Sequence, residues 1–224
     1  MPTPVAPAEL AKGLPADQAK VVLKSATEGA HMATVSLKDR LNARSHLLHQ
    51  IQNDLKQRRI PAEMDEQSGT LYLPGLLDFK SDTLPFTPEK QQGMRELAAV
   101  LAKHLPCFTQ QASQRPGCAE SSEARLDTLV IAGNAGSAPV GSGAFRHNWD
   151  LANARALATF AELLEAHPAL NNLRNTREQS LFRLDGFLPP EGATESKGQL
   201  SRPLRRVELR FVMDPAAHES HPPQ

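Results

Sequence analysis

Apolar residues recur at helical spacing in three parts of the chain. The first part runs from about position 16 to 59, where they stand three, four or seven residues apart among charged side chains. These residues are Leu37, Leu41, Leu48, Ile51 and Leu55. The pattern predicts a solvated helix with one apolar stripe, either packed on the following domain or forming a coiled-coil stalk.

A second helix is predicted where Thr87 is followed by Pro88 and Glu89, which together make a favourable helix start. The apolar stripe of this helix is Met94, Leu97, Ala98, Leu101 and Leu105.

The third helix is expected from about Asn148 to Ala166. The residues expected to face the core are Leu157, Phe160, Ala161 and Leu164. Asn148, Ala152 and Arg155 are spaced i, i+4 and i+7, so they should share another face of the helix. We therefore expect them to form a polar ridge at the rim of a sheet.

Four stretches predict strands. Positions 68–75 and 205–213 alternate apolar with polar residues. Positions 126–133 are nearly all apolar and end in glycine, which is typical of a central strand covered on its faces. Positions 180–187 also predict a strand. The order strand, helix, strand, helix, strand, strand indicates an α/β (α+β) sandwich of about 150 residues with helices packed on a sheet.

Composition divides the chain into four parts. Positions 1–16 are rich in Pro and Ala and have no apolar period, which predicts a disordered lead. We expect a helical linker or stalk at 17–60, the domain at 61–214 and a disordered tail at 215–224. The length suffices for one such domain with its own core.

Charge and hydropathy exclude several classes of partner. Lys plus Arg and Asp plus Glu both number 25, so no long-range field favours nucleic acid or an anionic membrane. The longest apolar stretch, at 97–102, falls far short of the ~20 residues that span a bilayer. The first ten residues do not resemble a secretory signal peptide. The protein is thus expected to be cytoplasmic or to have an export element outside this sequence.

Cys107 and Cys118 are the two cysteines, and they flank a loop-like segment marked by Pro106, Pro116 and Gly117. We favour a disulfide between them, which requires an oxidising compartment. Two free thiols are the second interpretation. A zinc site with His104 is the third, but it lacks a fourth ligand and the usual cysteine spacing.

The sequence gives little support to catalysis. The loop at 136–143 has the two glycines of a phosphate-binding loop, but Ser142 and Gly143 replace its lysine and its hydroxyl residue. Ser142 also does not form the G-x-S-x-G motif of hydrolases. His46 and His49 are expected to be surface residues. We therefore predict no enzyme activity, no catalytic residues, no metal and no cofactor.

Several stretches, in the same order, resemble the OmpA/MotB C-terminal domain family over most of positions 63–213. They correspond to the family's first strand with its lone Phe and first helix, its central strand, the start of its second helix, and its closing turn and strand. The matching segments are LPGLLDFKSDTLPFTPEKQQGMRELAAVLAKHL, LVIAG, NWDLANARA, GFLPP and LRRVELR. The resemblance implies a β-α-β-α-β-β mixed sheet.

Members of this family bind peptidoglycan without cleaving it, by surrounding the carboxylates of diaminopimelate in the stem peptide. Arg155 matches the family's carboxylate-holding Arg, and Arg206 matches its Arg before Val-Glu. A basic group is the natural partner of a carboxylate in a cleft. The ligand-binding residues implied by the resemblance are Arg155, Asn148, Leu151, Arg206 and Asn134.

The chain departs from the family at the ligand loop. Where the family reads Gly-His-Thr-Asp, this chain has Gly133, Asn134, Ala135 and Gly136, so the Asp that receives the ammonium group is absent. The loss of such a charge pair costs about two decades in affinity. Asp150 is better placed to cap a helix than to replace it. The ligand therefore differs, binds weakly, or is no longer bound.

The nearest members are MotB-type stator proteins, flagellar or Zorya-like. They imply a periplasmic protein of the cell envelope, with peptidoglycan as its partner. They also imply a homodimer, an ion-channel stator subunit beside it and an inner-membrane tether outside this sequence. The alternative is a scaffold or dimerisation domain of a motor-type membrane complex that has lost wall binding.

Overall fold

The computed structural model describes residues 16–79, 86–114, 118, 124–135, 145–188 and 205–215. The chain forms two compact units, Met1–Asn42 and Ala43–Gln224. Nearly all of the expected disordered lead and tail, and the glycine-rich loop at 136–143, lie outside the described residues.

A five-stranded mixed sheet forms the centre of the second unit. Its strands follow the order β1-β2-β5-β3-β4, with β3 parallel to β4 and all other neighbours antiparallel. They are β1 (Glu63–Asp65), β2 (Thr70–Tyr72), β3 (Leu126–Asn134), β4 (Phe182–Phe187) and β5 (Val207–Met213). The predicted fold class is confirmed. The three-residue strand β1 was not predicted.

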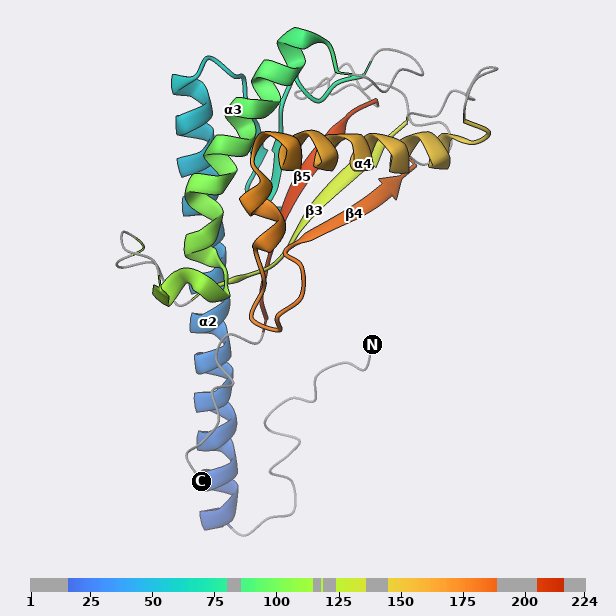
Figure 1. Ribbon diagram of the computed structural model, residues 1–224. Helices are drawn as coiled ribbons and strands as arrows, with labels where there is room; N and C mark the ends of the chain where they lie inside the picture. Colours follow the sequence, from blue (N-terminus) through green and yellow to red (C-terminus); the bar gives the residue numbers. More distant parts are fainter. Residues whose placement is uncertain are drawn as a thin grey trace. The chain divides into compact units, whose positions relative to one another are not determined.

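The three predicted helices are present. They are α2 (Ala16–Gln57), α3 (Pro88–His104) and α4 (Asn148–Ala166). Thr87 begins α3 as expected, since its hydroxyl oxygen accepts from the backbone N–H of Lys90 at 3.4 Å. Short 3-10 helices follow at Leu105–Phe108, Gln110–Gln114 and Pro168–Asn172. Figure 1 shows α4 lying across β3 and β4.

The second half of α2 belongs to the core of the sheet unit. Its buried apolar side chains are Ala43, Leu47, Leu48, Ile51 and Leu55. The compact unit therefore begins at Ala43, within the helix expected at 17–60. Over these residues the apolar stripe of α2 packs on the domain, which is one of the two arrangements expected from the sequence. Leu37 and Leu41, at the start of the same stripe, are exposed.

The buried face of α4 agrees with the prediction only in part, since Phe160 and Leu164 are half-buried against the core. Leu157 is 58% exposed and Ala161 is exposed, whereas Ala152 and Arg155 are fully buried. The expected polar ridge is therefore wrong, because this face of the helix points inward. It carries small residues that let α4 approach the sheet closely.

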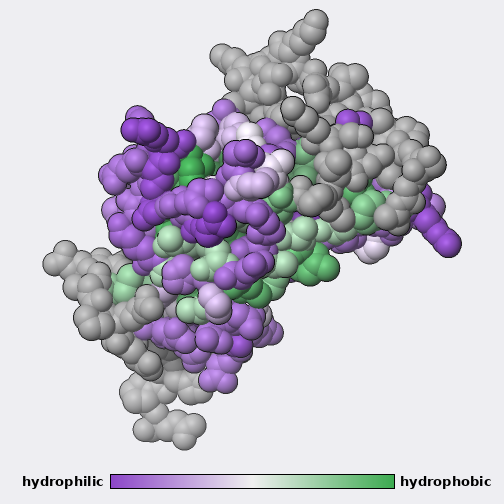
Figure 2. Space-filling model, turned by 45° about the horizontal axis from the view of Figure 1, so that its top comes forward, coloured by the Kyte–Doolittle hydropathy of each residue, from purple (hydrophilic) through white to green (hydrophobic). Residues whose placement is uncertain are grey.

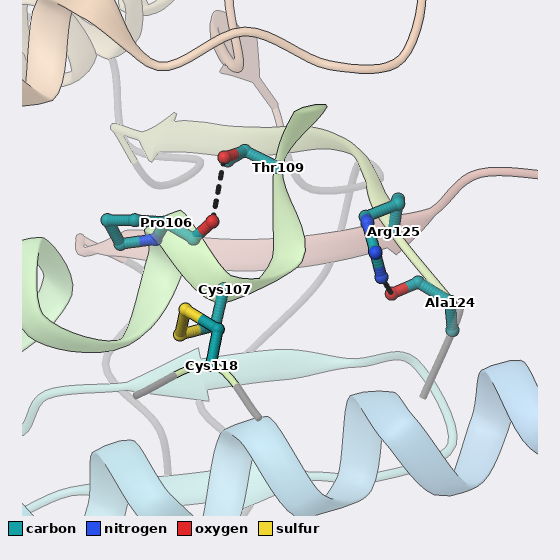
Figure 3. The surroundings of a disulfide bond; sticks show 6 residues. All are labelled: Pro106, Cys107, Thr109, Cys118, Ala124 and Arg125. Atoms are coloured by element: carbon teal, nitrogen blue, oxygen red, sulfur yellow. Dashed lines mark hydrogen bonds between the residues drawn. A yellow bond between two sulfur atoms is a disulfide. The ribbon is translucent and has the colours of Figure 1, made fainter. Parts of the chain in front are cut away.

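A disulfide joins Cys107, in the first 3-10 helix, to Cys118, with a Cα–Cα distance of 5.2 Å (Figure 3). Thr109 closes the same turn by donating its hydroxyl to the carbonyl of Pro106 at 2.9 Å. Because both sulfur atoms are used in this bond, neither cysteine can serve as a zinc ligand with His104.

None of the helices in the described ranges is both long and apolar enough to cross a bilayer.

Candidate functional site

The carboxyl end of β3 meets the first turns of α4 at unusually close range. A Cβ atom added to Gly133 would lie 2.0 Å from the backbone oxygen of Ala152. Any side chain at position 133 would therefore push α4 off the strand. Gly186 lies beside Gly133 on β4, and a Cβ there would meet the Asn153 side chain at 2.7 Å. These two glycines place the start of α4 over the end of the sheet.

Arg155 is the largest fully buried side chain of the described residues, with 0% exposure. Its Nη1 donates to the backbone carbonyl of Asn134 at 2.9 Å. Its guanidinium carbon also lies 4.9 Å from the ring centroid of Phe79. The hydrogen bond that the guanidinium donates and its cation–π contact both stabilise the charge when the group is removed from water. Arg155 therefore joins α4 to the end of β3.

Arg206 lies on the other side of Asn134. The backbone carbonyl of Arg206 accepts a hydrogen bond from the backbone N–H of Asn134 at 2.8 Å. Its guanidinium pairs with Glu208 Oε1, at 2.7 Å from Nε and 2.6 Å from Nη2. The guanidinium carbon also lies 5.4 Å from the ring centroid of Tyr72. This side chain is 17% exposed, so it is more accessible than Arg155. Three of the predicted site residues thus meet through the Asn134 backbone.

Phe79 and Lys90 complete this end of the sheet. The backbone N–H of Phe79 donates to the carbonyl of Arg205 at 2.9 Å, which fixes the ring under Arg155. Lys90 Nζ lies 5.4 Å from the same ring centroid and donates to the carbonyl of Asp78. The lone Phe before the polar turn was noted in the sequence, but no local pattern connects Lys90 with this place. Lys90 was therefore missed.

The structure gives Asn148 and Leu151 different surroundings. Asn148 is the half-buried first residue of α4, whereas Leu151 is buried in a small cluster with Ala135, Ala152 and Phe145. Asp150 accepts from the backbone N–H of His147 at 3.1 Å, so it caps α4. Gly136, the position of the family Asp, lies outside the described residues.

These contacts define what the site can do. Arg155, Arg206 and Lys90 bring three positive charges to the end of β3, opposed by Glu208 at close range. Such a group suits the binding of a carboxylate. Within the described ranges, no three His, Cys, Asp or Glu side chains gather in a way that could hold a metal ion.

The structure is similar to that of a MotB-like protein from Desulfovibrio vulgaris. The TM-score is 0.52 at 15% identity, and the match covers 79% of this chain and 98% of that one. The chain has the OmpA/MotB-like fold. The LVIAG segment lies in β3, NWDLANARA forms the first part of α4, and LRRVELR leads into the first residues of β5.

Two further structures match the OmpA/MotB-like chain at lower TM-scores. The cell wall anchor of the T6SS from Pseudomonas aeruginosa has a TM-score of 0.45 at 18% identity, covering 75% of this chain and 97% of that one. The periplasmic domain of Helicobacter pylori MotB has a TM-score of 0.44 at 17% identity, covering 68% and 78%. No protein-family model matches the sequence, and no curated protein matches it either.

Proposed function

We propose that this OmpA/MotB-like domain is a non-catalytic anchor that binds peptidoglycan, in a MotB-like stator or another envelope protein. The observation that carries the proposal is the meeting of Arg155 and Arg206 on either side of the Asn134 backbone. The two residues come from α4 and from the entry to β5, and both match positions of the family motif. A carboxylate of a stem peptide is the ligand that this charge favours.

The same contacts support a weak, altered site. Arg206 already pairs with Glu208, and Arg155 already donates to Asn134 beneath the surface. A ligand carboxylate must compete with these partners, and Gly136 offers no carboxylate for the ligand's ammonium group. We therefore propose that Arg206 makes the first contact with the ligand, while Arg155 holds the end of β3 in place.

The setting proposed for the protein follows from the same family. It is a periplasmic protein tethered to the inner membrane, a homodimer and a partner of an ion-channel stator subunit.

The second candidate function is that of a scaffold or dimerisation domain that has lost wall binding. The complete burial of Arg155 favours it, because a side chain without exposed surface contributes to folding before it contributes to recognition. The two candidates differ in whether the domain binds the wall at all.

Co-sedimentation of the full chain with insoluble peptidoglycan sacculi separates them. We expect measurable binding by the natural sequence, a loss of about tenfold or more for Arg206→Ala, and tighter binding for Gly136→Asp. Arg95→Ala is the matched control, since Arg95 is an exposed arginine on α3. Circular dichroism of each variant shows that its fold is retained.

Each outcome of the experiment decides between the candidates. Binding that Arg206→Ala abolishes and Arg95→Ala leaves unchanged supports a working wall anchor. Sedimentation only after Gly136→Asp supports the scaffold candidate, with a site that the missing Asp has switched off. Sedimentation by none of the variants contradicts wall binding.

A further inference from the structure

The strand β4 is one edge of the sheet, and in the described part of the chain no strand lies beside it on the side away from β3. Leu181 accepts a backbone hydrogen bond from Leu129 of β3 at 2.8 Å. Because backbone groups along a strand alternate in direction, those of Phe182, Leu184 and Gly186 point away from β3. Among the described residues no strand pairs with these groups, so this edge offers the donors and acceptors that a further strand requires.

Two opposite charges stand on the edge strand, on the sheet face away from α4. Arg183 and Asp185 are 69% and 53% exposed at their side chains, and they lie 3.8 Å apart. Edge strands that avoid pairing commonly carry charges of one sign, which repel a second copy. Opposite charges two residues apart do the reverse, because an antiparallel copy places each charge against its opposite.

We propose that β4 pairs in antiparallel with β4 of a second copy of this chain, about a two-fold axis at Leu184. In this register Arg183 stands opposite Asp185 of the partner subunit, and the reciprocal pair forms on the other side of the axis. The two strands then join into one continuous sheet. Such an isologous contact is closed, so it gives a dimer and not a fibre.

On the face toward α4, the same register places Phe182 opposite Gly186 of the partner subunit. Within each copy the Asn153 side chain already covers Gly186, so this face adds no new side-chain contact. Phe182 already packs on Phe160 of α4, with ring centroids 5.3 Å apart.

An exposed apolar side chain lies above the edge. α4 runs antiparallel to β4, since Asn153 lies at Gly186 and Phe160 at Phe182. Leu157 falls between these two contacts, level with Leu184, and is 58% exposed. Figure 2 shows hydrophobic residues, in green, among hydrophilic ones, in purple, on the face that it presents. In the proposed dimer the two copies of Leu157 approach each other over the joined strands.

This dimer uses Arg183, Leu184 and Asp185, whereas the proposed wall site uses Arg155 and Arg206. The dimer rests on the homodimer proposed above, but it does not depend on the wall site. Wall binding and the dimer can therefore fail separately, since one is measured by binding to sacculi and the other by oligomeric state.

Sedimentation velocity of the full chain over a wide range of concentrations tests the register. We expect a dimer for the natural sequence and a dissociation constant raised about tenfold or more for Arg183→Asp and for Asp185→Arg, because each change creates two like-charge pairs. The double swap Arg183→Asp with Asp185→Arg should restore the dimer. Leu184→Pro, which removes an N–H pointing away from β3, should give a monomer.

Arg210→Asp is the matched control. Arg210 stands in the same row of the sheet as Arg183, since both lie opposite Val130, but it is on the inner strand β5. We expect it to leave the dimer unchanged. A natural sequence that remains monomeric at every concentration would overturn the proposal. So would single reversals that dimerise normally, or a double swap that fails to restore a dimer lost in the single variants.

Discussion

The guanidinium of Arg155 on α4 donates to the backbone carbonyl of Asn134, the last residue of β3, at 2.9 Å. Since the arginine is also stacked on Phe79, one side chain links a helix, a strand end and the loop before α3. The residue that the sequence resemblance matches to a carboxylate-holding Arg thus has a structural contact in this chain.

We expect Arg155→Ala to lower the free energy of unfolding by about 3–5 kcal/mol, because it leaves a cavity and removes the charged donor to a buried carbonyl. Arg155→Lys should cost less but should not restore full stability, since an ammonium cannot reproduce the planar stacking on Phe79. Urea unfolding measures both. Arg95→Ala should change the free energy by less than about 0.5 kcal/mol, and an equally small effect of Arg155→Ala would contradict its structural role.

Gly133→Ala should destabilise the fold by about 3 kcal/mol or more, because its Cβ would meet backbone, the Ala152 oxygen, at 2.0 Å. Gly186→Ala is the comparison, since its Cβ would meet the Asn153 side chain, which can move. We expect the Gly186 variant to unfold at a distinctly higher urea concentration than the Gly133 variant. Equal midpoints would show that α4 shifts easily over both strands.

Removal of the Cys107–Cys118 disulfide should cost about 3 kcal/mol, because the bond restrains a short loop in the unfolded chain. The double variant Cys107→Ser with Cys118→Ser, compared with the natural sequence with and without reductant, measures this cost in urea. Reductant should lower the midpoint of the natural sequence and leave that of the double variant unchanged. If reductant also lowered the urea midpoint of the double variant, the loss of stability would not come from this disulfide.

Asp54 on α2 should make the fold sensitive to acid. The hydrogen bond from Lys103 Nζ at 2.7 Å, aided by His104 at 2.8 Å, lowers the pKa of the Asp54 carboxyl, although burial acts against this. Because the folded pKa lies below the unfolded value, the contribution to stability is complete above the ordinary aspartate pKa of about 3.9. It is lost as the pH falls through the folded pKa.

Asp54→Asn should therefore unfold more easily than the natural sequence at neutral pH, and the difference should shrink as the pH falls below about 4. Urea midpoints measured from pH 7 to pH 2 follow this difference. Asp39→Asn, at an exposed position, is the control and should change little at any pH. A constant difference between the Asp54 variant and the natural sequence would contradict the ion-pair explanation.

The sequence predicts those elements whose signal is local. Thr87 and Pro88 mark the start of α3, and the apolar run before Gly133 marks β3, so both were placed within one residue. The three residues of β1 are too few to show an alternation, which explains why it was missed.

The buried face of α4 and the geometry of the site depend on contacts that hydropathy does not express. Leu157 was expected in the core because it is large and apolar, whereas Gly133 and Ala152 bring strand and helix too close for large side chains. The contact of Arg155 with the Asn134 carbonyl joins residues 21 positions apart and follows from that close approach. The motif resemblance located these residues but not their partners.

The core position of residues 43–57 of α2 has a mechanical consequence. Leu47, Leu48, Ile51 and Leu55 are all fully buried, so a pull along this segment must shear four apolar side chains out of the core before the strands carry load. Residues 43–57 are thus the attachment through which a pulling force enters the core of the sheet unit. A fragment cut at position 61 would lose this attachment and expose the apolar surface beneath it.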